Sequence, residues 1–378
     1  MQIIPINLLF MVYYVSAVTL ELFELPGHTY PQAVCNDGTV AVYYHDTDYS
    51  KLGKIHVDLE GGNLCDSDET CLARCDRDND GEVDNHYCTA STGQSIQMNK
   101  GLFSSDEENP LHDFWHVHVP YCTSDTWAGT GYSEQCRYFF HGKHVFHNVM
   151  NSLSHHFNLF QASEFVLSGS SAGGFGVGLN CDNVAEWLHA NNPDMKVWCV
   201  ADAPDFIPWW VHTENCPRRA NDYQQFVNSF WSRDMDHSCQ EFAYNLENNV
   251  TKPEEMCGIL SQSLSFITTN IFISVSLQDT AIGPDYSCPQ QGAEDEVLLP
   301  WMSGMEEMVT AATETMPGIG WFVPICPLHA IFGGEEKDLL VRDIHTGEEF
   351  NAFTALAKWM QGDIVHAIDS LEDGNDCP

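Results

Sequence analysis

The chain has 378 residues, of which 54 are acidic and only 15 are basic, giving a formal net charge of −39. This charge argues against nucleic acid and anionic membrane surfaces as partners, because both are bound through clusters of Lys and Arg. Hydrophobic residues make up 43% of the chain, which is enough for a folded protein with a sizeable core.

The amino-terminal segment and the cysteines both predict export from the cell. Residues 1–17 contain an apolar run at 8–15 followed by Ser16 and Ala17, which resembles a secretory signal peptide cleaved near Ala17. No other segment is long and apolar enough to cross a bilayer. All 15 cysteines follow Ala17 and indicate a disulfide-braced fold; the odd count leaves at least one thiol outside the intrachain pairs. Asn249 begins an Asn-Val-Thr glycosylation acceptor, if the source glycosylates.

An early strand followed by a glycine turn is the first element with catalytic potential. Residues 54–59 alternate apolar and polar side chains, which predicts a strand that ends in Glu60-Gly61-Gly62-Asn63. The backbone N–H groups of Gly62 and Asn63 could stabilise an oxyanion, as the loop after an early strand does in α/β-hydrolases. A plain turn between strand and helix explains the same residues equally well.

A cysteine-dense segment, residues 65–88, contains an acidic loop with the pattern of a calcium site. Acidic residues at alternate positions and Gly81 at the sixth position follow an EF-hand-type loop. The twelfth position is Tyr87 instead of the usual bidentate Glu, so the alternative is a solvated acidic loop. The candidate ligands are Asp76, Asp78, Asp80, Glu82 and Asp84.

Residues 164–176 predict a short apolar strand, a turn of small residues and then a helix. Within this stretch, residues 169–173 fit the Gly-x-Ser-x-Gly pattern of a nucleophile elbow, with Ser171 at the apex. Such a turn is sharp enough to expose a serine only if glycines flank it, and the following helix directs free N–H groups to the same place. The alternative is a glycine-rich connection with a structural serine.

The remaining elements predict an α/β fold with a mostly parallel sheet flanked by helices. Each predicted strand ends in a glycine, serine or acidic turn, and helices separate most of them. Residues 206–264 are rich in aromatics and predict a cap-like insertion that could supply an apolar pocket. We expect a single domain, 18–378, with insertions at 65–88 and 206–264. The other predicted strands are 113–119, 196–201 and 270–277, and an apolar stretch follows at 320–325. The predicted helices are 144–160, 183–188 and 300–316.

Candidates for a catalytic acid and base follow the serine in the chain. In α/β-hydrolases the order is Ser, then Asp or Glu, then His, and Ser171, Asp279 and His329 satisfy it. Asp279 follows a predicted strand, and His329 follows an apolar run beside a cysteine. Asp202 and Asp205 remain open as alternatives for the acid, and His345 as an alternative for the base.

Several of these stretches together resemble the pectin acetylesterase family, which also contains the Notum carboxylesterases. The resemblance implies a secreted α/β-hydrolase with no required metal cofactor. It also implies that Ser171 is the nucleophile, Asp279 the acid and His329 the base, with oxyanion donors on the backbone of Gly62, Asn63 and Ala172. The stretches that carry it are Leu59-Glu60-Gly61-Gly62 with Cys65, Pro120-Tyr121-Cys122, residues 169–174, Asp202-Ala203, Gln278-Asp279 and Cys326-Pro327-Leu328-His329.

The sequence therefore predicts a secreted serine carboxylesterase that hydrolyses an O-acyl ester, of which acetyl is the first expectation, on a carbohydrate or other hydroxylated carrier. One alternative is a lipid-ester deacylase that acts on a protein. Another is a non-catalytic secreted protein that binds glycan or calcium on the same scaffold. Two features depart from expectation: Asn63 stands where the family usually has an aromatic residue, and a charge of −39 repels polyanionic pectin at low salt.

Overall fold

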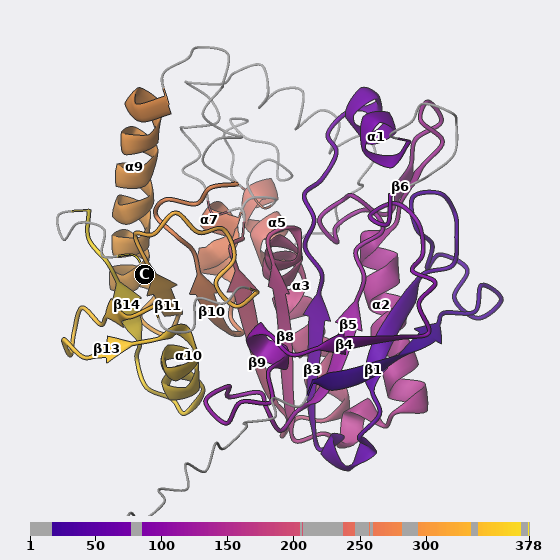
Figure 1. The fold of residues 1–378 in the computed structure, drawn as a ribbon, viewed down its shortest axis with the longest axis horizontal. Helices are drawn as coiled ribbons and strands as arrows, with labels where there is room; N and C mark the ends of the chain where they lie inside the picture. Colours follow the sequence, from indigo (N-terminus) through magenta and orange to yellow (C-terminus); the bar gives the residue numbers. More distant parts are fainter. Residues whose placement is uncertain are drawn as a thin grey trace, which may run out of the picture.

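A ten-stranded sheet organises the chain (Figure 1), with strand order β14-β11-β10-β9-β8-β3-β5-β2-β1-β4. This computed structural model describes residues 17–76, 85–204, 206, 237–245, 257, 260–281, 294–333, 339–371 and 377. The strands of the sheet are β1 (Val18–Glu24), β2 (Val42–Asp46), β3 (Lys54–Leu59), β4 (Ser95–Met98), β5 (Trp115–Val119), β8 (Glu164–Ser170), β9 (Lys196–Asp202), β10 (Asn270–Ser274), β11 (Gly320–Val323) and β14 (His366–Ile368).

The helices connect the strands and cover the sheet. They are α1 (Asp68–Cys75), α2 (Gly142–His156), α3 (Ala172–Asn191), α5 (His237–Asn245), α7 (Leu260–Ser263), α9 (Glu294–Thr315) and α10 (Ala352–Met360). The short 3-10 helices are η1 (Tyr49–Lys51), η2 (Gly101–Phe103), η3 (Leu159–Gln161) and η6 (Leu264–Phe266). Two small antiparallel pairs lie outside the main sheet: β6 (Gly131–Tyr132) with β7 (Phe139–Phe140), and β12 (Val341–Arg342) with β13 (Glu349–Phe350).

Seven neighbouring strands, from β14 to β5, run parallel to one another. Only β2, β1 and β4, at one edge, are antiparallel to their neighbours. In the centre, Asp58 of β3 lies beside Ser168 of β8 and His118 of β5. Because these strands point the same way, their carboxyl ends meet at one edge of the sheet, which is where ligand sites form in such folds.

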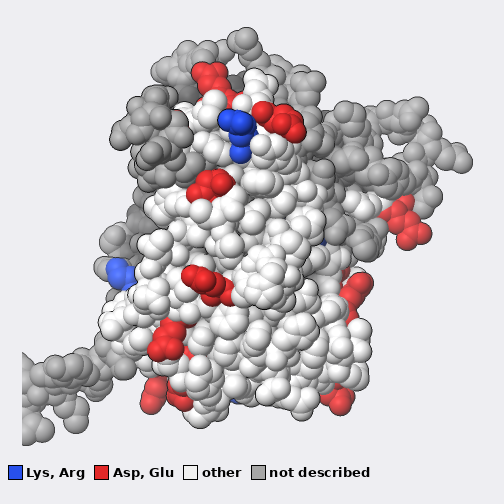
Figure 2. Space-filling model, turned by 90° about the vertical axis from the view of Figure 1, so that its right-hand side faces the viewer, with Lys and Arg blue, Asp and Glu red and all other residues white. Residues whose placement is uncertain are grey.

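The surface carries its negative charge widely. On the face shown in Figure 2, acidic side chains stand apart from one another on a largely uncharged surface, with few basic side chains between them. The net charge of −39 is therefore not the property of one binding patch on this face. It acts as a diffuse field that repels anions and is screened by salt.

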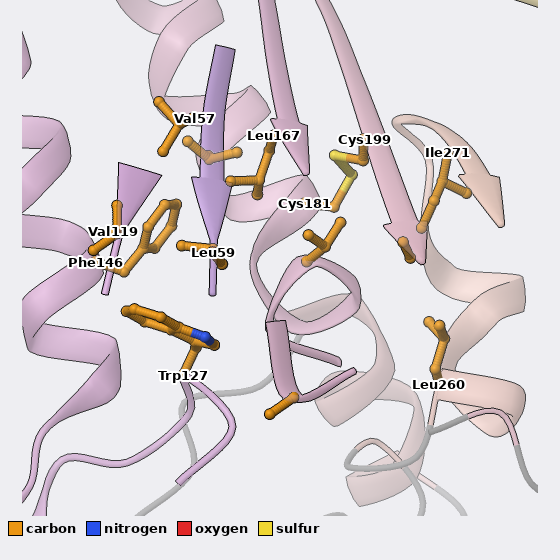
Figure 3. Packing of buried hydrophobic residues seen from close by; sticks show 14 of the residues in the cluster. Val57, Leu59, Val119, Trp127, Phe146, Leu167, Cys181, Cys199, Leu260 and Ile271 are labelled. Carbon is orange, nitrogen blue, oxygen red and sulfur yellow. A yellow bond between two sulfur atoms is a disulfide. The ribbon is translucent and has the colours of Figure 1, made fainter. Parts of the chain in front are cut away.

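One face of the sheet is apolar and packs against α2, α3 and α9. The alternation of side chains along each strand places these residues on the same side. Figure 3 shows part of this core, with Phe146 of α2 and Cys181 of α3 close to the strands. A disulfide between Cys181 and Cys199 joins α3 to β9 within this core. The residues that meet here include Val57, Leu59, Val119, Trp127, Phe146, Leu167, Leu260 and Ile271.

The opposite face is covered by α10 and by segments near residues 102 and 332. Over β9, β10 and β11 this face is apolar, with Val200, Phe272 and Phe322 against Phe353 and Leu356 of α10. Over β3, β5 and β8 it is polar, although the side chains there are also buried. The sheet is thus two-sided, with a polar region on three central strands that extends to Asp202 and Ser274 at the ends of β9 and β10.

Six disulfides connect the described residues, as the cysteine content predicted. Cys65–Cys71 and Cys75–Cys88 brace the segment 65–88, and Cys326–Cys377 ties the loop after β11 to the carboxyl-terminal region. The buried Cys136 is a free thiol, which agrees with the odd count. None of the described helices is long and apolar enough to span a membrane.

The predicted α/β fold with a mostly parallel sheet is confirmed, and each of the predicted strands is present. The helix predicted from 183 begins earlier, at Ala172, and the one predicted at 144–160 is α2, Gly142–His156. The predicted signal peptide lies outside the described residues except for Ala17, and so does most of the insertion 206–264. The division into domains stays a prediction.

Asp125, in the loop after β5, provides a test of the packing at the start of α2. Its buried carboxylate accepts hydrogen bonds from the Thr123 hydroxyl (2.7 Å) and the Gly142 N–H (2.7 Å). Burial raises the pKa of this carboxyl from its ordinary 3.8 to about 6, although the hydrogen bonds favour the charged form. Between about pH 4 and pH 6, the folded chain therefore keeps a proton that the unfolded chain has lost.

We expect Asp125 to make the free energy of unfolding fall as the pH rises through that window. The fall in wild type should exceed that of Asp125→Asn by about 2–3 kcal/mol, since each pKa unit corresponds to ~1.4 kcal/mol. Urea unfolding of both proteins across the window measures the two slopes, which are compared because the substitution also lowers stability at every pH. Parallel pH dependence in the two proteins would contradict the assignment.

Candidate active site

Ser171 occupies a sharp turn between β8 and α3. Its backbone has φ 55° and ψ −122°, in a region that residues other than glycine rarely adopt, and it is the residue that precedes the first turn of α3. The turn lies against the end of β3: a Cβ on Gly173 would be 1.9 Å from the Leu59 carbonyl oxygen. Glycine is required there because the two backbones approach too closely for any side chain. The predicted elbow geometry is present.

His329 and Asp279 are brought together from loops after β11 and β10. His329 Nδ1 lies 2.9 Å from each carboxylate oxygen of Asp279, which is fully buried, whereas the His329 side chain is 26% exposed. The two loops are joined by a hydrogen bond from the Leu277 N–H to the Pro324 carbonyl (2.9 Å). A buried carboxylate on Nδ1 fixes the orientation of the imidazole and makes Nε2 the nitrogen that can act as a base.

The loop from Gly61 to Asn63 lies beside the elbow. A Cβ on Gly61 would come within 3.1 Å of the Ser171 Cβ, and Gly62 and Asn63 have φ values of +148° and 65°. In the described part of the chain, the N–H groups of Gly62 and Asn63 donate to no acceptor. The N–H of Ala172, as the first residue of a helix, has no acceptor within the helix either. Their predicted role as oxyanion donors stays a prediction.

Arg74 of α1 holds this loop in place, a role that the sequence analysis missed. Its guanidinium donates a hydrogen bond to the Gly62 carbonyl and another, 2.9 Å long, to the Ser124 hydroxyl. The guanidinium also stacks on the Tyr87 ring, 5.0 Å from its centre. Cys65–Cys71 and Cys75–Cys88 bracket α1, so the cysteine-dense segment supports the turn. The one sequence signal was a basic residue within an acidic segment.

The alternative candidates lie elsewhere. The Asp202 carboxylate does not contact His329; it accepts hydrogen bonds from the Ser170 hydroxyl and from two backbone N–H groups of the segment after His329. Burial raises the pKa of Asp202, and these hydrogen bonds oppose the rise. His345 contacts His366 (2.8 Å) on β14, four strands from β8. Asp205 lies outside the described residues.

Behind the elbow, a buried polar network runs across β8, β3 and β5. The Ser168 hydroxyl donates to Asp58 (2.8 Å), so its oxygen is left to accept from His56 Nε2 (2.7 Å). His56 Nδ1 contacts His116 Nδ1 (2.8 Å), and His118 Nδ1 contacts the second oxygen of Asp58 (2.9 Å). In this network, each hydrogen bond is donated in the direction of Asp58, so the bonds converge on the Asp58 carboxylate.

Burial and hydrogen bonding set different charges on these histidines. Burial lowers the pKa of both His56 and His116 to about 3, so they are neutral. Burial would also lower the pKa of His118, but the hydrogen bond and charge of Asp58 outweigh it and raise that pKa. The alternating pattern His-x-Asp at 56–58 and His-x-His at 116–118 was the available sequence signal.

This network forms one wall of a cavity of about 400 Å³. The rest of its lining includes residues 97–100, Leu102, Phe103, Phe332 and Gly333. Ser171, Asp279 and His329 are not among its lining residues, but Gly61 and Ser170, their neighbours, are. The cavity is therefore adjacent to the back of the elbow and is separate from the side chains predicted to react.

Most of the predicted calcium loop, and the predicted glycosylation site, lie outside the residues that the structure describes. Asp78, Asp80, Glu82, Asp84 and Asn249 lie outside the described residues, whereas Asp76 is the residue that follows α1. The part of the chain that is described contains no cluster of three or more His, Cys, Asp or Glu residues able to hold a metal ion. Calcium binding and glycosylation both stay predictions.

Three features define an α/β-hydrolase: a mostly parallel sheet, a serine at a strand-to-helix elbow, and a bound aspartate–histidine pair that follows the serine in the chain. Residues 16–376 match the model of the Pectinacetylesterase family. The chain belongs to this family, a family of carboxylic ester hydrolases.

Curated relatives cover a smaller part of the chain. It is 40% identical over 158 residues to the palmitoleoyl-protein carboxylesterase notum2 of Xenopus laevis, covering 40% of this chain and 30% of that protein. It is 36% identical over 178 residues to the palmitoleoyl-protein carboxylesterase NOTUM of Homo sapiens, covering 46% of this chain and 34% of that protein. The similarity thus spans about a third of the length of these relatives.

Arg74→Ala tests whether the supported loop matters for turnover. Without the guanidinium, the carbonyl of Gly62 loses its donor and the turn can rotate, which misplaces the adjacent N–H groups. We expect kcat to fall by about 10- to 100-fold with little change in KM, because these donors act mainly on the transition state. The measurement is the steady-state hydrolysis of 4-nitrophenyl acetate.

Arg342→Ala is the matched control, since Arg342 is exposed and, among the described residues, forms its ion pair with Glu349 (3.1 Å) on the β12–β13 hairpin. It should leave kcat unchanged. Equal activity of Arg74→Ala and wild type would show that the loop does not depend on this residue.

Proposed function

We propose that the chain is a secreted serine carboxylesterase that hydrolyses an O-acyl ester on a carbohydrate or other hydroxylated carrier. The observation that carries the proposal is the contact of His329 with the buried Asp279, from the loop beside an elbow serine. The family match and the disulfides support it, because the family consists of ester hydrolases and disulfides persist in oxidising compartments.

In the proposed mechanism, Ser171 Oγ attacks the ester carbonyl while His329 Nε2 accepts its proton. Asp279, bound to Nδ1, orients the imidazole and stabilises its protonated form. The oxyanion that forms on the carbonyl oxygen accepts hydrogen bonds from the N–H groups of Gly62, Asn63 and Ala172. His329 then returns the proton to the leaving alcohol, and a water molecule hydrolyses the acyl-enzyme by the same steps. No step requires a metal.

The acyl group distinguishes two forms of this proposal. The named relatives are palmitoleoyl-protein carboxylesterases, which favours a long acyl chain on a protein as the second candidate. The family description favours acetyl esters of a glycan. The charge of −39 disfavours a polyanionic glycan at low salt, so a neutral carrier fits the acetyl form better than unmodified pectin does.

Ser171→Ala tests the proposal itself. Removal of the nucleophile should lower kcat on 4-nitrophenyl acetate by about 10⁴-fold or more. Ser163→Ala, at the opposite end of the same strand, is the control, because that exposed hydroxyl bonds only the Gly53 carbonyl among the described residues. Equal rates in wild type and Ser171→Ala would reject the esterase and leave a non-catalytic binding protein as the better hypothesis.

A series of 4-nitrophenyl esters from acetate to octanoate separates the two forms. A pocket built for acetyl groups gives kcat/KM values that fall with chain length, because each added methylene has no room. A pocket built for lipid gives values that rise by about 4-fold for each methylene, since each buried methylene contributes about 0.8 kcal/mol. We expect the first outcome, and a steady rise to octanoate would contradict it.

A further inference from the structure

One buried residue, Asp202, contacts both the turn that carries Ser171 and the segment that follows His329. It ends β9, between β8 and β10, and is only 2% exposed. Its backbone carbonyl accepts a hydrogen bond from the Ser171 N–H (2.9 Å), and its Oδ2 accepts one from the Ser170 hydroxyl (2.6 Å). The elbow is therefore bonded to Asp202 through two successive residues.

The same carboxylate is bound to the segment after His329. Oδ1 accepts the Ile331 N–H (3.0 Å), and Oδ2 also accepts the Phe332 N–H (3.1 Å). The side chains of Ile331 and Phe332 are buried in the core under α10, so this segment is anchored by packing as well. His329 lies two residues before the first of these bonds, and its own side chain is bound to Asp279.

We propose that Asp202 is a positioning residue that fixes His329 relative to Ser171. This proposal rests on the proposed function, since it assigns these two residues to the reaction. The histidine is held at two points: the imidazole by Asp279 and the backbone beyond it by Asp202. Because Asp202 is also bonded to the elbow, any movement of the base relative to the nucleophile must break one of these charge-assisted hydrogen bonds.

The substitution Asp202→Asn disrupts the hydrogen bonds between residue 202 and the segment after His329. An amide has one carbonyl oxygen, so in either orientation its NH₂ group faces a backbone N–H, of Ile331 in one case and of Phe332 in the other. Asp202→Asn therefore always releases part of the histidine segment. Ser170→Ala instead removes only the hydroxyl bond from the elbow and leaves the charge of Asp202 unchanged.

Ser168 offers a matched control on the same strand and the same face. Its hydroxyl is buried, whereas Ser170 is half-buried, and like that of Ser170 it is bonded to a carboxylate. That carboxylate is Asp58, which has no described hydrogen bond to the elbow turn or to the histidine segment. Ser168→Ala should lower the thermal stability at least as much as Ser170→Ala does, because the Ser168 hydroxyl is more deeply buried and makes two hydrogen bonds, and it should leave kcat unchanged. A purely structural role for these serines predicts equal effects on kcat.

The experiment measures kcat and KM for 4-nitrophenyl acetate, and the pH dependence of kcat/KM, in wild type, Asp202→Asn, Ser170→Ala, Ser170→Thr and Ser168→Ala. We expect kcat to fall by about 10- to 100-fold in Asp202→Asn and by about 3- to 10-fold in Ser170→Ala, with KM within about 3-fold. Ser170→Thr keeps a hydroxyl and should recover most of the loss. In Asp202→Asn, the acid limb of the pH profile should move to lower pH, because release of the histidine segment displaces the imidazole from the Asp279 carboxylate, which favours its protonated form.

Unchanged kcat in both Asp202→Asn and Ser170→Ala, or an equal loss in Ser168→Ala, would overturn the proposal. If Asp202→Asn does not fold, as judged by circular dichroism, the comparison of Ser170→Ala with Ser168→Ala decides the question alone. Failure of the proposed function gives a different result, because wild type and Ser171→Ala would then hydrolyse the ester at equal rates.

Discussion

The close approach of three strand ends is the constraint on which the site depends. The elbow after β8 lies so near the Leu59 carbonyl of β3 and the Asp202 carbonyl of β9 that Gly173 and Gly174 have no room for a Cβ. This packing forces Ser171 into a left-handed backbone conformation and starts α3 immediately after it. The serine and the first N–H of the helix are thereby placed at the same point, before any ligand arrives.

The two faces of the sheet contribute differently to this arrangement. Toward α2, α3 and α9, the strands present apolar side chains that form the larger core and fix the strand ends. Toward the other face, β3, β5 and β8 present His56, Asp58, His118 and Ser168, joined by hydrogen bonds. Buried polar groups are stable only when they are paired, so this network specifies the register of the strands that carry the loops of the site.

Local patterns allowed prediction of the strands and of the elbow. Residues 54–59 and 164–170 are short apolar or alternating runs that end in glycine turns, and both form the predicted strands. The order of Ser171, Asp279 and His329 was also readable, and the structure brings the last two into contact. The assignment of their roles remains for experiment.

Other features depend on contacts that no local pattern reveals. The early turns of α3 contain Gly173, Gly174, Gly176 and Gly178, which disfavour a helix, but Gly176 packs so closely on Trp127 that a Cβ would come within 2.6 Å of its ring. β4 has only two apolar side chains, Ile96 and Met98, and pairs with β1 at the sheet edge. Asp202 was a candidate acid from its position at a strand end; its actual partners, Ile331 and Phe332, are about 130 residues away in the chain.

Covalent labelling with a fluorophosphonate tests the central claim most directly, since such a reagent reacts only with a serine that a neighbouring base activates. The account predicts that the reagent adds to one site, that peptide mapping places it on Ser171, and that ester hydrolysis stops as labelling is completed. Labelling of a different residue, or hydrolysis that continues after Ser171 is fully modified, would contradict the account.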